Sequence, residues 1–586
     1  MQFIPETIRI RDMQGNILAF DITIQKDGPF TAVTARYLEQ EPVRLQNAEF
    51  AEMFHHCPPE TPVYAEGYNM LSQTEGTLEN PRDVSGLTDR GHYKLPVRDG
   101  FFTGYGLLLI LDNPIRLIGY SSAARFCGKI HFNGEKIILE QDLGGIEVNP
   151  GETICLEEIM LAEGNDRELL LEQLGNRLAK HHPYPEYPVM PTGWCSWYYY
   201  GGGVTQEDIC SNMDAMQRQL PALRFVQIDD GYEARIGDYL QTSDRFPDLD
   251  GLIAQIHAKG FEPAIWAAPF SASADSRLLK EHPEYFICDE EGKPLASDRY
   301  TFGGWNQGPW YMLDGTNPET CAYLKGLYAE MRKKWGIRYF KLDGTIWGAF
   351  WFGVRKNPRM SYIEGYRAGM QAILDGAGKD SYILGCNAPM WPSIVVHGMR
   401  ITGDISRNWG VFVHSAKECF YRNWQNRRLW INDPDCLLLE NAEVTVVGPD
   451  GNPVKSSTGL TDEELGFHRT QILASGGAVL NGDNLENLRP ESWELLCRCL
   501  DIPDTAARFD DTDFTIGRQM IGDDLLITLF NRREEDQLFT VDLAGCFDVY
   551  DFWNDQVYGR QVPSVSLSLP PHSARALRCK KSRKDK

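Results

Sequence analysis

The stretch Phe225-Val226-Gln227-Ile228-Asp229-Asp230-Gly231 decides the fold expected for this chain. It is a short, largely apolar run that stops at two aspartates and a glycine, which is typical of a buried parallel strand followed by a turn. The stretch Tyr339-Phe340-Lys341-Leu342-Asp343-Gly344 has the same form. Longer patterns of helical period lie between such runs, for example Thr205–Leu220, where Thr205 and Asp208 fit a capping box. The alternation predicts βαβ units and a parallel sheet.

The middle of the chain contains enough of these runs to close a barrel. Eight strands are predicted, at Gly193–Tyr198, Arg224–Ile228, Glu262–Ala267, Arg338–Leu342, Tyr382–Cys386, Gly398–Thr402, Arg428–Asn432 and Gly477–Asn481. With helices between them, they fit a (β/α)8 TIM barrel that ends near residue 495. An open, doubly wound sheet stays an alternative, because periodicity alone does not close a barrel.

The two ends of the chain are rich in predicted strands. Phe20-Asp21-Ile22-Thr23-Ile24 alternates apolar and polar residues, which is the period of a half-buried strand, and Leu525–Leu529 begins a similar series near the C-terminus. We expect a multi-domain α/β protein whose barrel is flanked by an N-terminal β-sandwich (a supersandwich) and a small C-terminal antiparallel β-sandwich. The predicted parts are 1–180 for the N-terminal domain, 181–500 for the barrel, 501–580 for the C-terminal domain and 581–586 for a basic tail.

The composition is that of an acidic, soluble protein. The 586 residues include 58 Lys and Arg but 82 Asp and Glu, so the formal net charge is −24. Such a chain repels phosphate backbones and anionic lipid surfaces, which argues against nucleic acid and membranes as partners. The start, Met1–Glu6, lacks a basic region followed by an apolar run, and the 14 cysteines form no paired CxxC motifs. We therefore expect a cytoplasmic protein with reduced thiols.

Acidic residues end several of the predicted barrel strands. The carboxyl ends of barrel strands converge on one face, so these side chains are expected to surround one site. A pair of carboxyl groups with divided roles, one nucleophile and one proton donor, is the equipment of a glycosidase. Any single aspartate of this kind could instead be a helix cap or a turn residue. The candidates at the strand ends, with two basic residues among them, are Asp229, Asp230, Lys341, Asp343, Arg400 and Asp404.

Aromatic residues in or just beyond the strands support a sugar site, because the apolar C–H faces of a sugar match aromatic rings. Each of them taken alone could equally belong to the core. They are Trp194, Trp197, Tyr198, Trp266, Trp305, Trp347 and Trp391. No metal or other cofactor is expected, since Asp433-Pro434-Asp435 does not continue as an EF-hand and His181-His182 lacks the HExxH context.

At these positions the sequence resembles the retaining α-galactosidases of glycoside hydrolase family 36. The order and spacing of the motifs match along the whole predicted barrel, and β-sandwiches on both sides also fit the family. The matching segments are Gly193–Tyr198, Gln227–Tyr232, Ile265–Phe270, Lys341–Gly344, Leu384–Pro389, Met399–Asp404 and Asn432–Asp435.

The resemblance implies catalytic roles for two residues. Asp343, which closes a KxD motif, would be the nucleophile that forms a covalent glycosyl-enzyme. Asp404, which closes an RxxxD motif, would be the general acid and then the base for the incoming water. In a retaining enzyme the two carboxyl groups should be about 5–5.5 Å apart.

The resemblance also implies a set of binding residues. Asp229 and Asp230 would bind the 4- and 6-hydroxyls of the sugar, and Lys341 would hold Asp343 ionised. Arg400 would lie near the 2-position. The remaining implied binding residues, which line or shape the same subsite, are Trp197, Tyr198, Trp266, Cys386 and Asn387.

Two segments depart from the family pattern. Members that act on plain galactosides often have Cys-Gly where this chain has Cys386-Asn387, in a loop that borders the 2-substituent, and Trp391 adds bulk to the same loop. Asn387 could therefore recognise something other than a bare hydroxyl, which keeps an N-acetylgalactosaminide or another α-glycoside open as an alternative substrate. The family's N-terminal domain usually offers a tryptophan to the site, but Gly67-Tyr68-Asn69-Met70-Leu71 lacks it.

The sequence thus predicts a retaining exo-acting α-glycosidase, with α-galactosidase as the first hypothesis. An α-N-acetylgalactosaminidase, another α-glycosidase and a galactosyl transferase of the raffinose-synthase kind are the enzymatic alternatives. A non-catalytic sugar-binding protein does not need the paired acids, and a metal-dependent lyase would lose activity with a chelator. Family members are often oligomeric, which leaves a homo-oligomer open.

Overall fold

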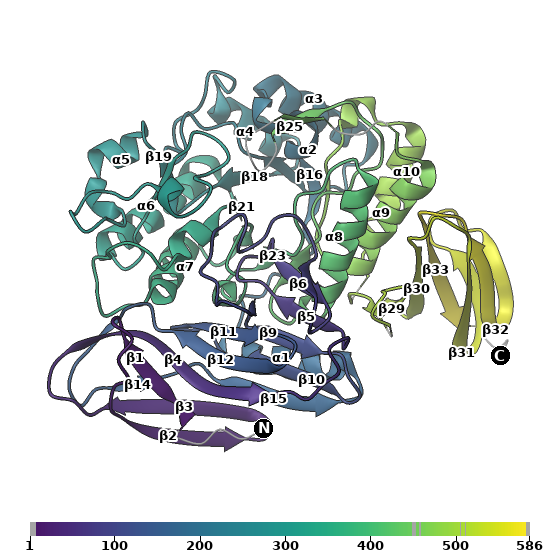
Figure 1. The fold of residues 1–586 in the computed structure, drawn as a ribbon. Helices are drawn as coiled ribbons and strands as arrows, with labels where there is room; N and C mark the ends of the chain where they lie inside the picture. The colour runs from purple at the N-terminus through teal and green to yellow at the C-terminus, as the bar shows by residue number, and fades with distance from the viewer. Residues whose placement is uncertain (1–6, 448–452, 456–458, 504, 510, 582–586) are drawn as a thin grey trace. The chain divides into compact units, whose positions relative to one another are not determined.

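The computed structural model describes residues 7–447, 453–455, 459–503, 505–509 and 511–581, and the chain forms two compact units. Unit 1 contains Met1–Glu186, Glu233–Gln241 and Trp266–His397; unit 2 contains Tyr187–Tyr232, Thr242–Ile265 and Gly398–Lys586. The predicted barrel strands are divided between them. Each unit is described by itself, with the elements labelled as in Figure 1.

The N-terminal part of unit 1 consists of two antiparallel sheets, as the period-2 patterns predict. One has the strand order β1-β4-β12-β11-β8, with β13 paired to β4; the other has the order β14-β3-β15-β10-β9-β5-β6-β7, with β2 paired to β3. Figure 1 shows them as layers, with β4 and β12 above β3 and β15. The strands are β1 (Arg9–Asp12), β2 (Phe20–Asp27), β3 (Phe30–Tyr37), β4 (Val43–Phe54), β5 (Val63–Glu66), β6 (Gln73–Gly76), β7 (Pro81–Asp83), β8 (Phe102–Tyr105), β9 (Leu107–Ile110), β10 (Ile115–Tyr120), β11 (Cys127–Phe132), β12 (Lys136–Asp142), β13 (Glu147–Val148), β14 (Thr153–Cys155) and β15 (Ile159–Gly164).

Helix α1 (Arg167–His181) covers part of the second sheet. It begins where the Asp166 side chain accepts hydrogen bonds from the backbone N–H groups of Glu168 and Leu169, the usual chemistry of an N-cap. Its buried residues include Leu174, whose methyl groups lie against Gly119 of β10. Close contact of the leucine with a glycine thus sets how near the helix approaches the sheet.

All eight predicted barrel strands are present in one parallel sheet. Its order is β24-β23-β22-β21-β18-β17-β16-β27, so each strand lies beside its neighbour in the chain. The strands are β16 (Thr192–Cys195), β17 (Phe225–Ile228), β18 (Glu262–Ala267), β21 (Tyr339–Leu342), β22 (Tyr382–Gly385), β23 (Gly398–Arg400), β24 (Ile431–Asp433) and β27 (Val479–Asn481). The first is shorter than predicted because Trp197–Tyr200 turns into helix α2.

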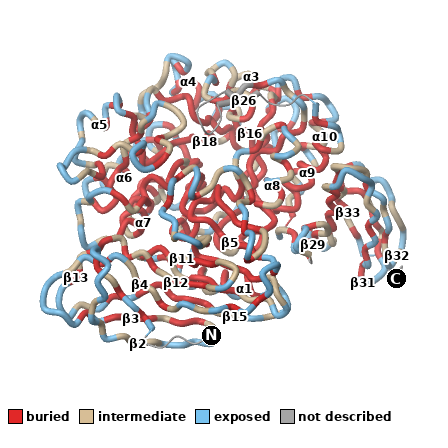
Figure 2. The backbone as a smooth tube through the Cα atoms, in the orientation of Figure 1, coloured by how far each residue is buried: buried red, intermediate tan, exposed pale blue. Residues whose placement is uncertain are grey.

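Backbone hydrogen bonds in unit 2 bring the last strand back to β24 and so favour the barrel over an open sheet. The N–H of Ala478 donates to the Asn432 carbonyl at 2.8 Å, and the N–H of Leu437 donates to the Leu480 carbonyl at 2.8 Å. With β16 paired to β27, the sheet closes nearly on itself. Figure 2 shows barrel strands such as β16 and β18 as buried.

Helices separate the barrel strands at the expected places. In α3 the side chain of Thr205 accepts from the N–H of Asp208 while the Asp208 carboxylate accepts from the N–H of Thr205, so the predicted capping box is confirmed. The helices are α2 (Trp197–Tyr200), α3 (Gln206–Gln219), α4 (Leu249–Ala258), α5 (Arg277–Glu281), α6 (Pro318–Trp335), α7 (Tyr362–Ala377), α8 (Trp409–Arg422), α9 (Asp462–Ser475) and α10 (Pro490–Arg498). Two antiparallel two-stranded sheets are added: β19 (Ser271–Ser273) with β20 (Trp310–Met312), and β25 (Thr445–Val447) with β26 (Pro453–Lys455).

The C-terminal part of unit 2 is an antiparallel sheet of order β28-β29-β30-β33-β31-β32. The long strands β31 and β32 contribute to an apolar core that includes Phe539, Val541 and Val565, so the sheet supplies the interior predicted for a small sandwich. The strands are β28 (Arg508–Phe509), β29 (Ile516–Ile521), β30 (Asp524–Asn531), β31 (Gln537–Asp551), β32 (Val557–Leu569) and β33 (Ser573–Lys581). The predicted basic tail lies, beyond Lys581, outside the described residues.

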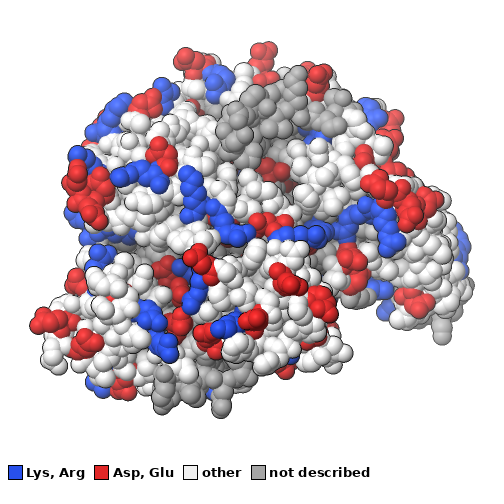
Figure 3. Space-filling model, in the orientation of Figure 1, with Lys and Arg blue, Asp and Glu red and all other residues white. Residues whose placement is uncertain are grey.

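The surface carries charges of both signs, as expected from a composition with many basic and still more acidic residues. Acidic and basic side chains are interspersed over the face drawn in Figure 3. Among the residues that the structure describes, none of the helices combines the length and the apolar character that a bilayer crossing requires.

The closure of the barrel predicts the effect of one substitution. A Cβ atom at Gly477 would lie 1.8 Å from the Asn432 carbonyl oxygen, so Gly477→Ala should push the closing strands apart. We expect a loss of about 3 kcal/mol or more, seen as a lower midpoint of thermal unfolding and a lower soluble yield. The control is Gly326→Ala in α6, where a Cβ meets nothing within 4 Å, and where alanine should stabilise the helix by about 0.5–1 kcal/mol. Equal midpoints for the two variants would contradict this account of the closure.

Candidate active site

Asp343 lies directly after β21 in unit 1, where its carboxylate is held from two sides. One carboxylate oxygen accepts from the indole Nε1 of Trp266 at 3.1 Å, and the other accepts from the N–H of Gly344 at 2.7 Å. The backbone N–H of Asp343 donates to the Ala267 carbonyl at 2.8 Å, which ties the residue to the end of β18. Hydrogen bonds of this kind favour the ionised form of a carboxyl group and fix its orientation. The side chain is only half-buried and stays accessible.

Lys341 and an aromatic wall accompany Asp343 in the same unit. Lys341 is buried in β21, two residues before the aspartate. The Trp266 ring packs edge-on against Trp305 at a centroid distance of 6.3 Å, and the Trp305 ring also reaches Gly344. Trp305 is partly exposed, so it can offer a ring face to a ligand beside Asp343.

The loop after β22 brings Cys386 and Asn387 to the same strand end. The N–H of Cys386 donates to the Leu342 carbonyl at 2.8 Å, and the N–H of Ile346 donates to the Asn387 carbonyl at 3.1 Å. The backbone of Asn387 is left-handed, with φ +45°. Glycine adopts this conformation freely and asparagine tolerates it better than most residues. The departure from Cys-Gly in the family pattern is therefore conservative for the backbone, and its consequence lies in the added side chain.

Two residues of the N-terminal part, which the sequence did not identify as site residues, bind the side chain of Asn387. The Asn69 amide Nδ2 donates to Asn387 Oδ1 at 2.8 Å, and the Tyr93 hydroxyl donates to the same oxygen. Backbone bonds join the same segments, since Met70 N–H donates to the Ala388 carbonyl at 2.9 Å. Some 300 residues separate the partners along the chain, so no local pattern could have revealed the contact. The Gly67–Leu71 turn, which lacks the tryptophan of the family pattern, thus contributes an amide that supports the loop.

Asp89 holds this turn in place from within the protein. Its carboxylate accepts from the backbone N–H of Tyr68 at 2.7 Å and from that of Asn69 at 3.1 Å. Burial raises the pKa of Asp89 to about 7, although the two N–H groups lower it. A buried carboxyl group therefore stands behind the residue that supports Asn387.

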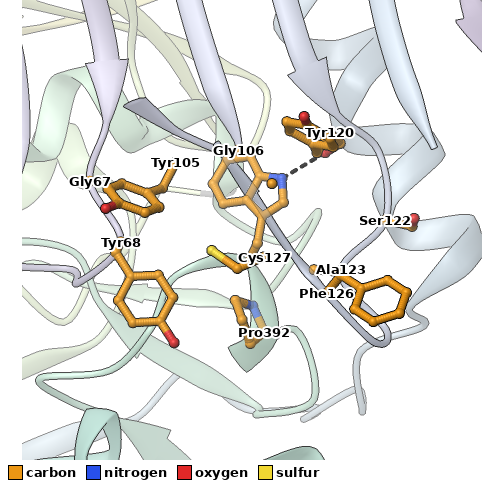
Figure 4. Close-up of a pocket in the computed structure, with 12 residues that line it drawn as sticks. Gly67, Tyr68, Tyr105, Gly106, Tyr120, Ser122, Ala123, Phe126, Cys127 and Pro392 are labelled. Atoms are coloured by element: carbon orange, nitrogen blue, oxygen red, sulfur yellow. Dashed lines mark hydrogen bonds between the residues drawn. The ribbon is translucent and has the colours of Figure 1, made fainter. Parts of the chain in front are cut away.

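Trp391, in the same loop, packs against the N-terminal sheet. Trp391 is buried, and its indole Nε1 donates to the Tyr120 carbonyl of the N-terminal sheet at 2.7 Å, the dashed bond in Figure 4. Its ring lies against Gly106, where a Cβ would come within 2.8 Å of the indole. The tryptophan anchors the loop to the sheet. A large indole ring is stabilised by burial when its N–H has a hydrogen-bond partner, and Trp391 meets both conditions here.

Asp229 and Asp230 follow β17 in unit 2 and are both buried. One Asp229 carboxylate oxygen accepts from the Gln227 amide at 2.7 Å and from the Cys195 thiol at 3.4 Å, and the other accepts from the Asp230 N–H at 3.0 Å. The backbone N–H of Asp229 donates to the Ser196 hydroxyl at 3.0 Å. Buried acids are costly unless such donors compensate them, and these bonds hold the pair at the strand end.

Arg400 and Asp404 form the second group of unit 2. The Arg400 guanidinium, only 1% exposed, donates to the Asp404 carboxylate at 2.9 Å and also to the carboxylate of Asp435. Tyr198 donates its hydroxyl to that same Asp435 oxygen. Asp404 is 54% exposed, so one buried cation links an accessible acid to a buried one.

Asp435 is a site residue that was recognised from the sequence only as part of the segment Asn432–Asp435. Burial raises its pKa to about 7, although Arg400 lowers it, and Asp404 contributes in the raising direction. The residue after Asp404 also helps to fix it, because the backbone N–H of Ile405 donates to the Asp435 carboxylate at 2.8 Å. In the sequence, Asp435 is marked only as the second aspartate after a predicted barrel strand. Its spacing does not link it to Asp404.

The remaining predicted aromatic residues separate into two kinds. Trp197 is partly exposed beside Tyr198 at the end of β16, as a site residue should be. Trp194 is completely buried and donates its Nε1 to the Asp483 carbonyl at 2.8 Å, so it belongs to the barrel interior and offers no face to a sugar. No group of three or more His, Cys, Asp or Glu residues suited to a metal occurs within the described part of the chain.

Part of the chain matches a known protein family. Residues 180–346, from the linker before β16 to the residues after Asp343, match the family model described as Melibiase. This confirms the resemblance drawn from the motifs, and the melibiase region includes Asp229, Asp230, Trp266 and Asp343. Asp404 and Arg400 lie beyond it.

Two curated relatives align with shorter parts of the chain. A type blood alpha-D-galactosamine galactosaminidase from Flavonifractor plautii is 29% identical over 158 residues, which cover 26% of this chain and 14% of the relative. The bifunctional alpha-galactosidase/sucrose kinase AgaSK from Mediterraneibacter gnavus is 25% identical over 211 residues, 33% of this chain and 21% of the relative. The chain thus spans about a fifth or less of the length of these curated relatives.

Solved structures extend the likeness beyond the melibiase region. The galactosidase domain of AgaSK superimposes with a TM-score of 0.65 at 12% identity, covering 98% of this chain and 88% of that domain. The alpha-galactosidase TtGalA from Thermus thermophilus, solved with p-nitrophenyl alpha-D-galactopyranoside, has a TM-score of 0.61 at 20% identity, covering 85% of this chain and 98% of that one. At these identities the likeness establishes the multi-domain fold around a TIM barrel.

The buried carboxyl group behind the Gly67–Leu71 turn gives a prediction about pH. The pKa of Asp89 is raised from its ordinary value of 3.8 to about 7 in the folded protein, so its favourable contribution is complete below about pH 4 and is lost as the pH rises through 7. Asp89→Asn removes the titration. We expect the variant to become more stable relative to the native protein as the pH rises from 4 to 7. The difference in the free energy of unfolding should change by up to about 1.4 kcal/mol per pH unit, and the thermal unfolding midpoints should follow it. A difference that stays constant over this range would show that Asp89 is ionised throughout.

Proposed function

We propose that this protein is a retaining, exo-acting α-glycosidase that hydrolyses terminal non-reducing α-D-galactosyl residues. The observation that carries the proposal is Asp343, an accessible carboxylate at the end of β21, oriented by Trp266 and Gly344 and included in the melibiase match. A nucleophile must be exposed to the substrate yet held in one orientation, and both conditions are met here.

The proposed reaction is a double displacement. A carboxylate oxygen of Asp343 attacks the anomeric carbon, the bond from that carbon to the leaving oxygen breaks, and Asp404 gives its proton to the leaving oxygen. Asp404 then takes a proton from water, the water oxygen attacks the anomeric carbon, and the bond to Asp343 breaks. The sugar leaves with its original configuration, and both carboxyl groups return to their starting states.

Asp404 is accessible and held in one orientation, as its proposed role requires. It is half-exposed, which leaves room for an aglycone or a water, while Arg400 fixes its carboxylate at 2.9 Å. Asp435 and Tyr198 in turn hold the guanidinium from the buried side. We propose that Asp229, held by Gln227 and Ser196, and its neighbour Asp230 bind sugar hydroxyls, as the resemblance implies.

The similar proteins support α-galactosides as the substrate class, since TtGalA has been solved with p-nitrophenyl alpha-D-galactopyranoside and with stachyose. A second candidate is an α-N-acetylgalactosaminidase. It is favoured by the alignment with a galactosaminidase and by Asn387, which places an amide where many family members have no side chain. A transferase of the raffinose-synthase kind would use the same covalent step with a sugar acceptor, and product analysis with and without acceptor separates it from a hydrolase.

We also propose a cytoplasmic location and activity without a metal or other cofactor. All 14 cysteines, every one of them in the described part of the chain, are free thiols, which suits a reducing compartment. Homo-oligomer formation stays a proposal drawn from the family resemblance.

Replacement of the nucleophile should abolish hydrolysis while leaving the fold intact. We expect Asp343→Ala to lose at least about 10³-fold in kcat on p-nitrophenyl α-galactoside, because no covalent intermediate can form. Sodium azide should restore turnover by occupying the vacated space and attacking the anomeric carbon directly, giving the β-galactosyl azide. An unchanged thermal midpoint is the control, and near-normal turnover without azide would rule out Asp343 as nucleophile.

Replacement of the acid should instead make the rate depend on the leaving group. In Asp404→Ala, a natural α-galactoside should lose about 10²–10⁴-fold, whereas aryl substrates with very acidic leaving groups need little protonation and should lose much less. Azide should then attack the glycosyl-enzyme and give the α-galactosyl azide. Equal losses on both substrate kinds, or the β-azide as product, would remove Asp404 from this role.

A further inference from the structure

Unit 1 contains a cleft of about 670 Å³, which we call the sheet cleft. One wall is the sheet of β4, β12 and β11, and the other is the loop 351–360 between β21 and α7. The volume is in the range of small-molecule sites. The lining contains none of the candidate active-site residues, all of which the structure describes. The polar residues that line the sheet cleft include Asn47, Lys129, Glu140, Asp142, Glu147 and Arg355.

The register of the sheet explains why polar side chains gather in the cleft. Asn47 of β4 pairs with Asp142 of β12, and Glu140 of β12 pairs with Lys129 of β11. Partners across antiparallel strands project from the same face of a sheet, and so do residues two apart along one strand. These four side chains therefore belong to one face, which forms the floor of the sheet cleft.

The charged groups on this floor are compensated within the protein. The ammonium of Lys129 lies 2.9 Å from a carboxylate oxygen of Asp142 and 3.9 Å from one of Glu140. Burial lowers the pKa of Lys129, but the two carboxylates outweigh burial and raise that pKa above its ordinary value. The guanidinium of Arg355 donates to the Phe352 carbonyl at 3.1 Å. A charged ligand would have to compete with these pairs, so the cleft favours a neutral one.

The loop wall is held in place by backbone hydrogen bonds. Val354 donates to the Cys288 carbonyl at 2.7 Å, and Cys288 donates to the Val354 carbonyl at 3.1 Å. The N–H of Glu147, on the sheet side, donates to the Pro358 carbonyl of the loop at 2.9 Å. The two walls are thus joined directly, and the sheet cleft is formed before a ligand binds.

Two side chains indicate the kind of ligand. Trp351 is partly exposed, and the rings of Phe350 and Phe352 pack against it at nearly perpendicular angles. The Oδ1 of Asn47 is buried and has no hydrogen-bond partner among the described residues. Such an atom costs free energy that a bound hydroxyl group would recover by donating to it. An aromatic ring beside fixed donors and acceptors matches the apolar C–H face and the hydroxyl groups of a sugar.

We infer that the sheet cleft binds a short neutral oligosaccharide, with one sugar ring against Trp351 and a hydroxyl group that donates to Asn47 Oδ1. Hydroxyl groups both donate and accept, so they can bind to Lys129, Glu140 and Asp142 without separating the ion pairs. The site holds the sugar without cleaving it. The inference is therefore independent of the proposed hydrolysis at Asp343.

Amide hydrogen exchange, followed by mass spectrometry, locates binding along the chain. The ligands are three neutral tetrasaccharides, stachyose, maltotetraose and cellotetraose, with inorganic phosphate as the charged comparison. Asp343→Ala is used as the background so that stachyose is not consumed. We expect at least one tetrasaccharide to slow exchange in residues 44–47 and 351–360, and phosphate to leave both segments unchanged. The dependence on sugar concentration gives the dissociation constant.

Variants of the two recognition residues test the contacts. Trp351→Ala should weaken this binding about tenfold, because the ring face is lost. The matched control is Trp493→Ala, which removes another partly exposed tryptophan, on α10, and should leave the dissociation constant unchanged.

Asn47→Ala separates recognition from a structural role. It should also weaken binding about tenfold, the effect of one hydrogen bond. It should not lower the thermal unfolding midpoint, because the deleted oxygen has no partner among the described residues in the free protein. A purely structural asparagine would give a lower midpoint and an unchanged dissociation constant.

Three results would overturn the inference. They are native exchange in both segments with all three tetrasaccharides, an unchanged dissociation constant in both Trp351→Ala and Asn47→Ala, and slower exchange with phosphate alone. The proposed function is read separately, from exchange in residues 227–232 and 341–347 with stachyose. If those segments alone are slowed, the sheet cleft is not a sugar site, while the proposed function keeps its support.

Discussion

The closure of the barrel at Gly477 is the constraint on which the arrangement of functional residues depends. The N–H of Ala478 reaches the Asn432 carbonyl only because residue 477 has no side chain to hold the strands apart. A closed parallel barrel has all its strand ends of one kind on one face, so residues that follow strands become neighbours without any local sequence relation. Short strands suffice for this: β23, β24 and β27 have three residues each, and each is buried throughout.

The parts of the fold that the sequence predicted are those that local chemistry determines. All eight barrel strands were identified because a short apolar run that stops at Asp or Gly has few alternatives, and α3 because its capping box is complete within four residues. The aspartates at 229, 230, 343 and 404 were found in the same way, since each follows a strand. The boundaries were less exact where a strand continues directly into a helix, as at Trp197.

The contacts that the sequence could not predict join distant segments. Trp194 and Trp266 both lie in barrel strands, yet one donates to a carbonyl of the interior and the other to the carboxylate of Asp343. The direction of a side chain from a strand depends on the register of the sheet, which a tryptophan in isolation does not reveal. The hydrogen bonds of Trp391, Asn69 and Tyr93 depend on which loop packs against the N-terminal sheets. Only the three-dimensional structure supplies that information.

The position of Asn387 shows how a backbone requirement and a buried hydrogen-bond network can be combined. The left-handed conformation restricts the choice to glycine and very few other residues, so a side chain can be added there almost only as asparagine. An added amide next to Asp343 would be costly if its oxygen were buried without donors. Asn69 and Tyr93 supply those donors, and Asp89 holds the turn that carries Asn69. The N-terminal sheets therefore do more than support the barrel, because the polarity of one wall beside the candidate nucleophile is set by residues that belong to them.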